Sequence, residues 1–305
     1  MHEILTEAGA PPDVVQYFHS GDFAAIEKLV RAPEIQLVCF TGSVAGGLAV
    51  QKAASDEVST RVGLELGGKD PAYVRADVDP DWAAEEIVDG AIFNSGQSCC
   101  SIERVYVDER VHDGFVAAVQ KVLAKYKLGD PFNKATQIGP VVSKRSAQTI
   151  QAHIQDAVSK GAKNATPDNA TFANPPSDGN YVAPTLLINV THDMTVMKDE
   201  TFGPVIPVMK VKDDAEAVRL MNDSEFGLTA SIWTKDAAKG DEIADEVDAG
   251  TVFVNRCDYP SPDLAWVGVK NSGKGQTLSK FGFDQFSKLK SYHIKQYPQS
   301  LGAST

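Results

Sequence analysis

The sequence has no apolar run long enough to cross a membrane and no excess of positive charge. Its 305 residues include 29 Lys and Arg against 41 Asp and Glu, which gives a formal net charge of −12 at pH 7. A membrane-spanning helix needs roughly 20 consecutive apolar residues. Nucleic acids and anionic membranes attract basic surfaces instead. We therefore expect neither a nucleic-acid partner nor a membrane partner.

Cysteine and histidine are scarce and scattered. The four cysteines are Cys39, Cys99, Cys100 and Cys257, and none stands in a Cys-x-x-Cys pair. The six histidines show no metal-ligand spacing, so we expect neither a disulfide framework nor a metal site. The first residues, MHEILTE, lack the basic and apolar stretches of a signal peptide. These features predict a reducing, cytoplasmic location.

Strand-like and helix-like stretches alternate along the chain, which predicts an α/β fold. Short apolar runs predict strands at residues 35–40, 62–66, 72–74, 105–107, 185–190, 205–211, 230–233 and 251–254. Amphipathic spacing and caps predict helices at residues 3–9, 22–31, 45–54, 79–92, 111–127, 144–160, 213–222 and 236–248. Residues 161–180 and 256–276 are predicted to be loops, and the run near Tyr292–Ile294 a terminal strand.

The pentapeptide Gly96-Gln97-Ser98-Cys99-Cys100 follows the end of a predicted helix. A cysteine placed after a glycine-containing turn can lie on the floor of a cleft. Backbone N–H groups can there stabilise its thiolate and then an oxyanion formed from it. Two buried core cysteines are the alternative interpretation, and the pentapeptide alone leaves both open.

The segment Leu64-Glu65-Leu66-Gly67-Gly68-Lys69 puts a carboxylate at the end of an apolar strand, before two glycines. Ligands of α/β sheets gather at the carboxyl ends of strands. A partly desolvated glutamate there has a raised pKa, which suits a general base. A simple surface glutamate at a strand end is the alternative for this hexapeptide taken alone.

Two further segments are weak signals by themselves. Phe40-Thr41-Gly42-Ser43, with Gly47 four residues on, places glycines between a predicted strand and helix, where a backbone can approach a phosphate. It is not the G-x-G-x-x-G pattern, so a tight turn explains it equally well. Glu200-Thr201-Phe202-Gly203-Pro204 precedes a predicted strand and reads in isolation as a loop.

In this order, the four segments together resemble the aldehyde dehydrogenase superfamily, because four ordered motifs are far harder to match by chance than one. The resemblance covers essentially the whole chain. It implies an aldehyde dehydrogenase-like α/β fold, with a partial Rossmann-type cofactor domain and an α/β catalytic domain. Residues 1–67 would be the C-terminal part of the cofactor domain, residues 68–270 the catalytic domain, and residues 271–305 a return segment with an oligomerisation strand.

The resemblance also implies a reaction. Cys99 would attack an aldehyde to form a thiohemiacetal, a hydride would pass to the nicotinamide, and Glu65 would activate water to hydrolyse the remaining thioester. The cofactor would be NAD or NADP, with NAD the commoner case. A small-molecule aldehyde would be the substrate, and a homo-oligomer the expected assembly.

Other residues take roles through the same resemblance. The expected cofactor contacts are Gly42, Ser43 and Gly47 at the pyrophosphate, Thr41 and Leu66 at the nicotinamide end, Glu200 at the nicotinamide ribose, and Phe202 beside the ring. Trp266 would shape the substrate entrance. Cys257 would either line the substrate pocket or be a buried cysteine at a strand end.

The chain also departs from the family. Relatives begin far earlier, so this sequence lacks the first strands of the cofactor domain and an asparagine that donates to the oxyanion, a loss worth roughly 10²–10³ in rate. Gln276-Thr277 stands where many relatives have Arg-Glu. A truncated chain, a misplaced start and a genuine short paralogue would each explain the missing N-terminal part. The alternative function is a non-catalytic remnant that associates with a full-length homologue, and a third is a weak cofactor-independent esterase.

Overall fold

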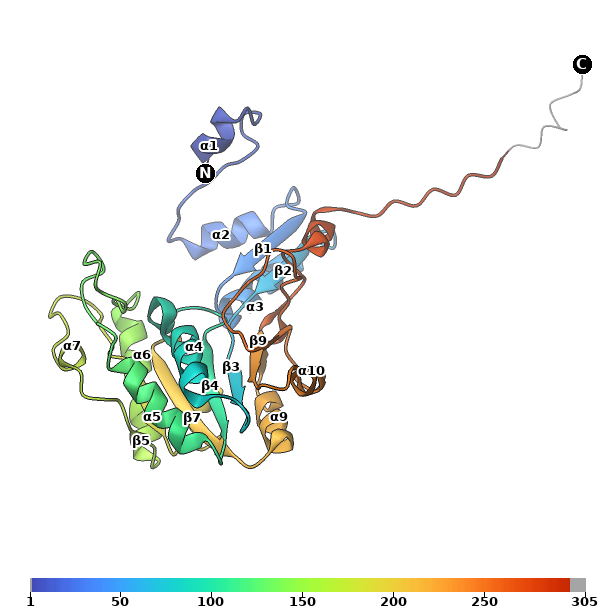
Figure 1. Cartoon of the computed structure of the whole chain (residues 1–305). Coiled ribbons are helices and arrows are strands. Elements are labelled where there is room, and N and C mark those ends of the chain that lie inside the picture. Colours follow the sequence, from blue (N-terminus) through green and yellow to red (C-terminus); the bar gives the residue numbers. More distant parts are fainter. Residues whose placement is uncertain (1, 297–305) are drawn as a thin grey trace, which may run out of the picture.

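Two sheets organise the chain in the computed structural model, which describes residues 2–296 (Figure 1). The smaller sheet has the order β1-β2-β12, formed by Leu37–Thr41, Arg61–Glu65 and Gly273–Lys274. β1 and β2 are parallel, and β12 pairs with β2 in the antiparallel direction. A short segment from near the C-terminus therefore completes a sheet that begins near the N-terminus.

The larger sheet has the order β10-β9-β3-β4-β7-β6-β5. Its strands are Asp70–Val74 (β3), Ile102–Asp108 (β4), Lys163–Asn164 (β5), Thr185–Ile188 (β6), Val205–Val211 (β7), Thr229–Trp233 (β9) and Thr251–Val254 (β10). All neighbours are parallel except β5, which is antiparallel to β6. Phe226–Gly227 (β8) and Val269–Lys270 (β11) form a separate antiparallel pair. The predicted α/β fold is confirmed.

Helices connect the strands and cover the larger sheet (Figure 1). The α-helices are His2–Glu7 (α1), Phe23–Val30 (α2), Val44–Ala54 (α3), Pro80–Ile92 (α4), His112–Leu123 (α5), Lys144–Ser159 (α6), Ala170–Ala173 (α7), Thr195–Lys198 (α8), Asp214–Asn222 (α9) and Ala237–Asp245 (α10). Two 3-10 segments occupy Phe93–Gly96 (η1) and Lys280–Phe286 (η2). Among the described residues, none of the helices is long and apolar enough to cross a bilayer.

The core of the molecule surrounds the larger sheet. Every side chain of β3 and of β4 is buried, because helices pack on both faces of these parallel strands. One apolar cluster joins β3 and β4 to α4 and α5, and a second joins β7 and β9 to α6 and α9. Trp233, fully buried, stands edge-on to Trp82 of α4 with 5.4 Å between ring centroids.

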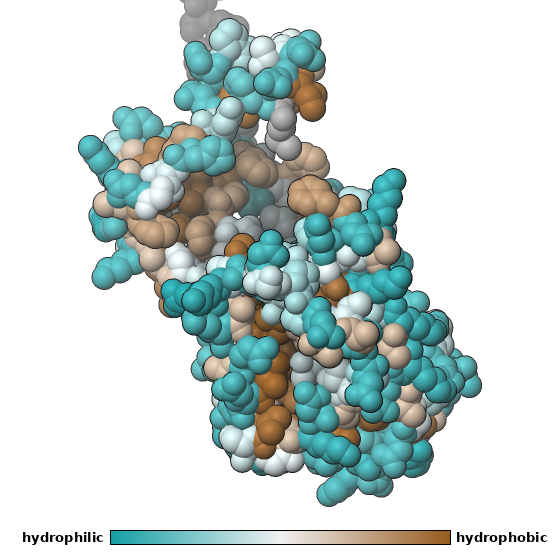
Figure 2. Space-filling model, turned by 90° about the vertical axis from the view of Figure 1, so that its left-hand side faces the viewer, coloured by the Kyte–Doolittle hydropathy of each residue, from teal (hydrophilic) through white to brown (hydrophobic). Residues whose placement is uncertain are grey.

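The N-terminal elements are packed less tightly. α1 lies apart from the two sheets, and α2 lies over the smaller sheet (Figure 1). Large apolar side chains exposed in this part include Val14, Tyr17, Phe18, Phe23 and Leu48. In the space-filling view, hydrophobic surface gathers in a hollow in the upper part of the molecule, while the lower part is mostly hydrophilic apart from a narrow hydrophobic strip (Figure 2). The smaller sheet is thus far less covered than the larger one.

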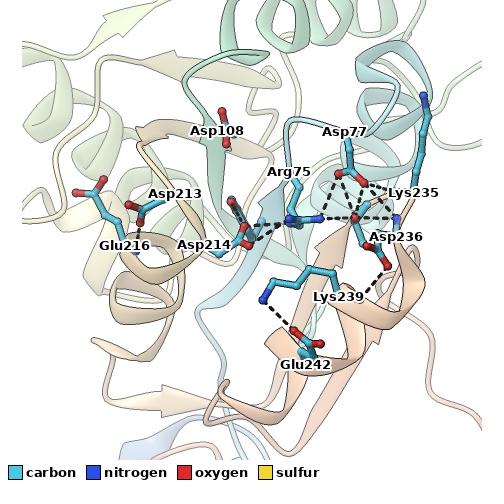
Figure 3. A network of polar contacts seen from close by, with 12 residues as sticks. Arg75, Asp77, Asp108, Asp213, Asp214, Glu216, Lys235, Asp236, Lys239 and Glu242 are labelled. Atoms are coloured by element: carbon cyan, nitrogen blue, oxygen red, sulfur yellow. Dashed lines mark hydrogen bonds and ion pairs between the residues drawn. The ribbon is translucent and has the colours of Figure 1, made fainter.

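Polar side chains close the carboxyl edge of the larger sheet (Figure 3). Arg75, just past β3, donates to both carboxylate oxygens of Asp214, at 3.0 and 3.2 Å. Asp77 accepts the backbone N–H groups of Lys235 and Asp236 at 3.0 and 3.1 Å. These contacts join β3, α9 and α10 at the edge where ligands of parallel sheets usually bind. The predicted site residues lie elsewhere in the fold.

The predicted terminal strand at Tyr292–Ile294 is wrong for this chain by itself. These residues form no strand, and Tyr292 and Ile294 are 74% and 81% exposed. A strand needs a neighbour for its backbone hydrogen bonds, and the apolar run meets none within the described residues. The end of the predicted return segment, residues 297–305, lies outside the described part of the chain.

Sequence periodicity also missed short elements. The predicted loop at residues 256–276 contains β11 and β12, and the one at 161–180 contains β5 and α7. Each is only two to four residues long, too short to display a period. The pairing of β11 with β8 and of β12 with β2 comes from contact with strands earlier in the chain.

Gly273 lies where the C-terminal segment meets β2, and substituting it tests this contact. Its φ is +137°, and a Cβ there would collide with the carbonyl of Leu64. Gly273→Ala is expected to lower the free energy of unfolding by about 2 kcal/mol or more. Chemical denaturation measures this.

Gly161→Ala is the matched control, because Gly161 also has a positive φ, +104°, but has open space around it. That variant carries backbone strain alone, about 1 kcal/mol. Equal losses in the two variants would show that the close approach of β12 to β2 is unimportant.

Candidate active site

The two sheets meet end to end. β1 and β2 finish at Thr41 and Glu65, and Gly67-Gly68 leads directly from β2 into β3. A Cβ on Gly68 would lie 2.5 Å from the carbonyl oxygen of Cys99, so only glycine allows this approach. The carboxyl ends of β1 and β2 therefore face the amino ends of β3 and β4. The predicted motifs gather at this junction.

Cys99 lies in a tight turn between α4 and β4. The N–H of Ser101 donates to the carbonyl of Ser98 at 3.1 Å, which makes Cys99 and Cys100 the central residues of a β-turn. The hydroxyl of Ser101 bonds the carbonyls of Gly90 and Ala91, each at 3.1 Å, and fixes the turn to α4. Cys99 is half-buried and Cys100 is buried. The thiol of Cys99 is therefore the accessible one of the pair.

Three consecutive residues before this turn have left-handed backbone conformations. The φ angles of Asn94, Ser95 and Gly96 are +50°, +60° and +70°. Such conformations cost roughly 1–3 kcal/mol each in residues other than glycine and collect at functional sites. Asn94 and Gln97 compensate by exchanging two side-chain to backbone bonds of 3.0 Å. The chain thus reverses sharply at the end of α4 and presents the cysteine turn.

The two adjacent thiols have opposite pKa shifts. A hydrogen bond from Cys100 lowers the pKa of the Cys99 thiol, against burial and the charges of Glu65 and Asp258. The same bond, with burial and Asp258, raises the pKa of Cys100 far above its usual range. Because the thiolate is the nucleophilic form of cysteine, these directions favour Cys99 as the candidate nucleophile of the pair.

Glu65 is placed to serve as a base. Burial raises the pKa of its carboxyl, although hydrogen bonds from Thr277 and Trp266 oppose the shift. The hydroxyl of Thr277 donates to Glu65 Oε1 at 3.1 Å. The charge of Glu65 in turn raises the pKa of Cys99, so the two groups share one electrostatic environment. A carboxylate with a raised pKa near a thiol can remove a proton at neutral pH.

Trp266 and Cys257 occupy different surroundings. Trp266 is 9% exposed and packs in a small cluster with Cys100, Leu228 and Phe253, against which Cys99 also packs. It therefore lies beside the candidate nucleophile. The Cys257 sulfur lies 3.7 Å from the carbonyl of Glu86 in α4, and burial raises its pKa to about 12. Cys257 is partly buried and packs against the main apolar cluster, so both predicted alternatives, a pocket-lining cysteine and a buried one, stay open.

Glu200 approaches the same junction from the segment before β7. Its Oε1 accepts the N–H of Gly68 at 3.0 Å, and a Cβ on Gly67 would lie 2.6 Å from its carboxylate. Burial, with the nearby charge of Glu103, raises the pKa of Glu200 from 4.5 to about 7. Phe202, two residues on, has a φ of +49° and is 38% exposed. Both predicted cofactor contacts thus lie on one strained turn.

The start of α3 carries the remaining predicted cofactor residues. Thr41 ends β1, and Ser43 caps α3 by accepting the N–H of Gly46 at 3.2 Å. Packing accounts for the glycines themselves: a Cβ on Gly42 would lie 2.7 Å from the Phe40 ring, and one on Gly47 would lie 2.7 Å from the side chain of Leu66.

This helix end fits a phosphate group. Within the described part of the chain, the first two N–H groups of α3, those of Val44 and Ala45, have no hydrogen-bond partner. Free N–H groups at a helix N-terminus attract phosphate through their donors and the helix dipole. Glu200 lies at the other end of the junction and offers a carboxylate to a ribose hydroxyl. The residues present therefore fit a dinucleotide.

Three residues beyond the predicted set take part in the site. Asp258 Oδ1 accepts from Ser98 Oγ at 3.1 Å and lies 2.8 Å from Cys100 Sγ. Thr277 bonds Glu65, and Glu103 accepts the N–H groups of Thr201 and Phe202 at 2.7 Å each. Glu103 lies outside the strand predicted at residues 105–107, and its burial became apparent only from the longer β4. No local pattern pointed to Asp258, which is 158 residues away from Cys100.

A comparison with protein families identifies this arrangement. The model of the "Aldehyde dehydrogenase family" matches residues 1–292. This chain belongs to the aldehyde dehydrogenase family. The resemblance predicted from the four motifs is thereby confirmed.

Individual relatives agree with the assignment. Betaine aldehyde dehydrogenase of Sinorhizobium fredii is 34% identical over 292 residues, which cover 96% of this chain and 59% of the relative. The crystal structure of the NAD-dependent aldehyde dehydrogenase from Sinorhizobium meliloti superposes with a TM-score of 0.90 at 35% identity, covering 97% of this chain and 59% of that one.

A further structure is the NADP-dependent glyceraldehyde-3-phosphate dehydrogenase of Bacillus halodurans C-125, complexed with NADP. It has a TM-score of 0.82 and 38% identity, covering 90% of this chain and 56% of that one. The chain thus spans a little more than half the length of the relatives it matches.

The opposite pKa shifts predict selective alkylation. With iodoacetamide at neutral pH, Cys99 is expected to react well before Cys100, as measured by mass spectrometry of the labelled peptides. Glu65→Gln removes a charge that raises the pKa of Cys99. The pH midpoint of labelling should therefore move down in the variant. Cys257 serves as the slow internal reference. Preferential labelling of Cys100, or an upward shift in the variant, would contradict the assignment.

The raised pKa of Glu200 predicts how stability depends on pH. A carboxyl whose pKa is higher in the folded than in the unfolded chain stabilises the fold. This contribution is complete at pH values below the unfolded pKa, and it is lost as pH rises through about 7. Glu200→Gln should therefore gain stability over the original chain as pH rises from 4.5 to about 7. Urea denaturation at several pH values measures the difference. A difference independent of pH would argue against the shift.

Proposed function

We propose that this chain oxidises an aldehyde to a carboxylic acid with NAD or NADP, NAD being the commoner case. One observation carries the proposal: the half-buried thiol of Cys99, with a lowered pKa, shares its environment with the carboxylate of Glu65, whose pKa is raised. A nucleophile beside a general base is what thioester formation and hydrolysis require. Family membership supports the same chemistry. It does not favour the alternative of a non-catalytic remnant.

The first half of the reaction uses Cys99. Its thiolate adds to the carbonyl carbon of the aldehyde, and the carbonyl oxygen becomes an oxyanion. The backbone N–H of Cys99, which already stabilises the thiolate, is a donor suited to that oxyanion. The bound nicotinamide supplies the hydride acceptor. Loss of hydride from the former aldehyde carbon leaves a thioester on Cys99.

The second half uses Glu65. Its carboxylate takes a proton from a water molecule, and the resulting hydroxide attacks the thioester carbon. The carbon–sulfur bond breaks, the acid leaves, and Cys99 returns as a thiolate. The hydrogen bond from Thr277 keeps the carboxylate in place. Trp266, which packs beside the nucleophile, would shape the approach of the substrate.

The cofactor would bind along the junction between the sheets. We assign its pyrophosphate to the start of α3, with Gly42, Ser43 and Gly47, and its nicotinamide end to Thr41, Leu66, Glu200 and Phe202. The free N–H groups of α3 and the carboxylate of Glu200 support this placement. Residues 1–67 would then be the C-terminal part of the cofactor domain, residues 68–270 the catalytic domain, and residues 271–305 the return segment.

We further propose a homo-oligomer in a reducing, cytoplasmic compartment. The segment at residues 287–296 extends away from the body (Figure 1) and carries the exposed apolar side chains of Leu289, Tyr292 and Ile294. β10 is an edge strand of the larger sheet and could pair with such a segment from a second copy. The four cysteines are free thiols, which suits a reducing compartment. The net charge of −12 gives no support for a nucleic-acid or membrane partner.

Variants of the pair test the reaction. With a panel of short aldehydes, Cys99→Ala should abolish formation of reduced cofactor. Glu65→Gln should allow at most one turnover and then leave a thioester on Cys99, with the steady rate reduced about 10²–10⁴-fold. Absorbance of the reduced nicotinamide gives the rates, and intact-protein mass spectrometry gives the thioester.

Cys39→Ala is the control, because Cys39 is an exposed thiol outside the cysteine turn. It should keep the original rate. Cofactor reduction that persists in Cys99→Ala would refute the role of Cys99. A soluble, folded original chain that reduces no cofactor with any aldehyde or cofactor would refute the proposed activity.

A further inference from the structure

Two charged side chains are buried beneath the candidate cofactor turn. Lys69 is 1% exposed and Glu103 is 4% exposed. Lys69 Nζ lies 2.6 Å from Glu103 Oε2, and burial lowers the pKa of Lys69 while Glu103 opposes that shift. Desolvating two charges is costly, and their mutual attraction offsets this only where further hydrogen bonds satisfy them. Those further bonds identify what the pair does.

Both carboxylate oxygens of Glu103 accept hydrogen bonds from one turn. Its Oε2 accepts the N–H of Thr201 and its Oε1 the N–H of Phe202, each at 2.7 Å. Two consecutive N–H groups can point at one carboxylate only if the backbone bends sharply. Phe202 accordingly has a φ of +49°, a conformation that a bulky residue adopts only under constraint. Glu103 supplies that constraint through charge-assisted bonds.

Lys69 ties the same turn to the loop after β2. Its Nζ donates to Thr201 Oγ1 at 3.0 Å. The neighbouring N–H of Gly68 donates to Glu200 Oε1 at 3.0 Å. The turn at residues 200–202 and the loop at residues 67–69 are therefore joined at two adjacent points. One of these points is the carboxylate assigned above to the cofactor ribose.

We propose that Lys69 and Glu103 are a positioning pair that locks the turn at residues 200–202 and thereby sets the affinity for the nicotinamide end of the cofactor. The proposal rests on the proposed function for the roles of Glu200 and Phe202. Lys69 and Glu103 are buried beneath the turn and act through its backbone. A pair that served only overall stability would not act selectively on this turn.

The first test measures the turn directly in the chain without cofactor. Hydrogen exchange of the Thr201 and Phe202 amides is compared in the original chain and in Glu103→Gln. A glutamine has one acceptor oxygen, so at least one of the two N–H bonds is lost. We expect exchange at residues 201–202 to accelerate about 10-fold or more, since a charge-assisted bond contributes at least that factor. Exchange in the buried strands β4 and β7 should stay unchanged.

Glu109→Gln is the matched control, because Glu109 directly follows the other end of β4 and is exposed. It should leave exchange at the turn unchanged. Glu103→Gln leaves the Lys69 charge buried without its carboxylate, so the variant could unfold. The double variant Lys69→Met with Glu103→Gln removes both charges and avoids that cost. It should fold and still show fast exchange at residues 201–202.

The second test measures cofactor affinity by the fluorescence of added NADH and NADPH. We expect the dissociation constant of the better-bound cofactor to rise about 10-fold in Glu103→Gln and in the double variant, as loss of one such bond implies. In active protein, the KM for cofactor should rise with the KM for aldehyde unchanged. Glu109→Gln should match the original chain in each measurement.

The outcomes separate the two proposals. Unchanged exchange at residues 201–202 in both variants would overturn the positioning pair. So would acceleration spread equally through β4 and β7, or local acceleration with unchanged cofactor affinity. If the original chain bound neither cofactor, the proposed function would fail and the link to affinity with it. The exchange data would then still decide whether the pair locks the turn.

Discussion

The structure depends on the hydrogen bonding of ionisable side chains that are buried at the amino edge of the larger sheet. Lys69, Asp70, Glu103 and Arg104 are each at most 4% exposed. Asp70 accepts from the N–H and hydroxyl of Thr229 at 3.1 and 2.6 Å, and Arg104 donates to the carbonyl of Lys69 at 2.7 Å. Because an unpaired buried charge is so costly, these contacts admit few alternative arrangements. They fix the loops that carry the candidate active site relative to one another.

Within that frame, small differences in environment give neighbouring groups different chemistry. Cys99 and Cys100 are adjacent in sequence, yet their hydrogen bond lowers the pKa of the first and raises that of the second. Glu65 and Glu200 both have raised pKa values through burial, but Glu65 accepts from Thr277 and its charge acts on Cys99, whereas Glu200 accepts from Gly68 in the loop after β2. Position and burial, more than residue type, are therefore the basis on which we propose one carboxylate as a base and the other as a cofactor contact.

The sequence predicted what depends on local pattern. Buried strands such as β3 and β7, and the capped helix α4, follow from apolar spacing and from Asp79-Pro80, and the motifs around Cys99 and Glu65 located the junction. Contacts between distant segments were beyond reach. The two residues of β12 have no periodicity, and Asp258 meets Cys100 only after folding. The strand predicted at Tyr292–Ile294 failed for a related reason: its pattern was apolar, but a strand also requires a partner.

The close approach of Gly96 to Gly203 has a mechanical consequence. A Cβ on Gly96 would collide with the carbonyl of Gly203, so the reversal that precedes Cys99 and the turn that carries Phe202 touch backbone to backbone. Packed backbones without intervening side chains have little freedom to slide. The reversal before Cys99 and the turn at residues 200–202 should therefore move together as one rigid body. If the chain works as proposed, the clearance that water needs to reach a thioester on Cys99 would therefore come from the cofactor or from the Glu65 side, because this close contact leaves the two turns little room to separate.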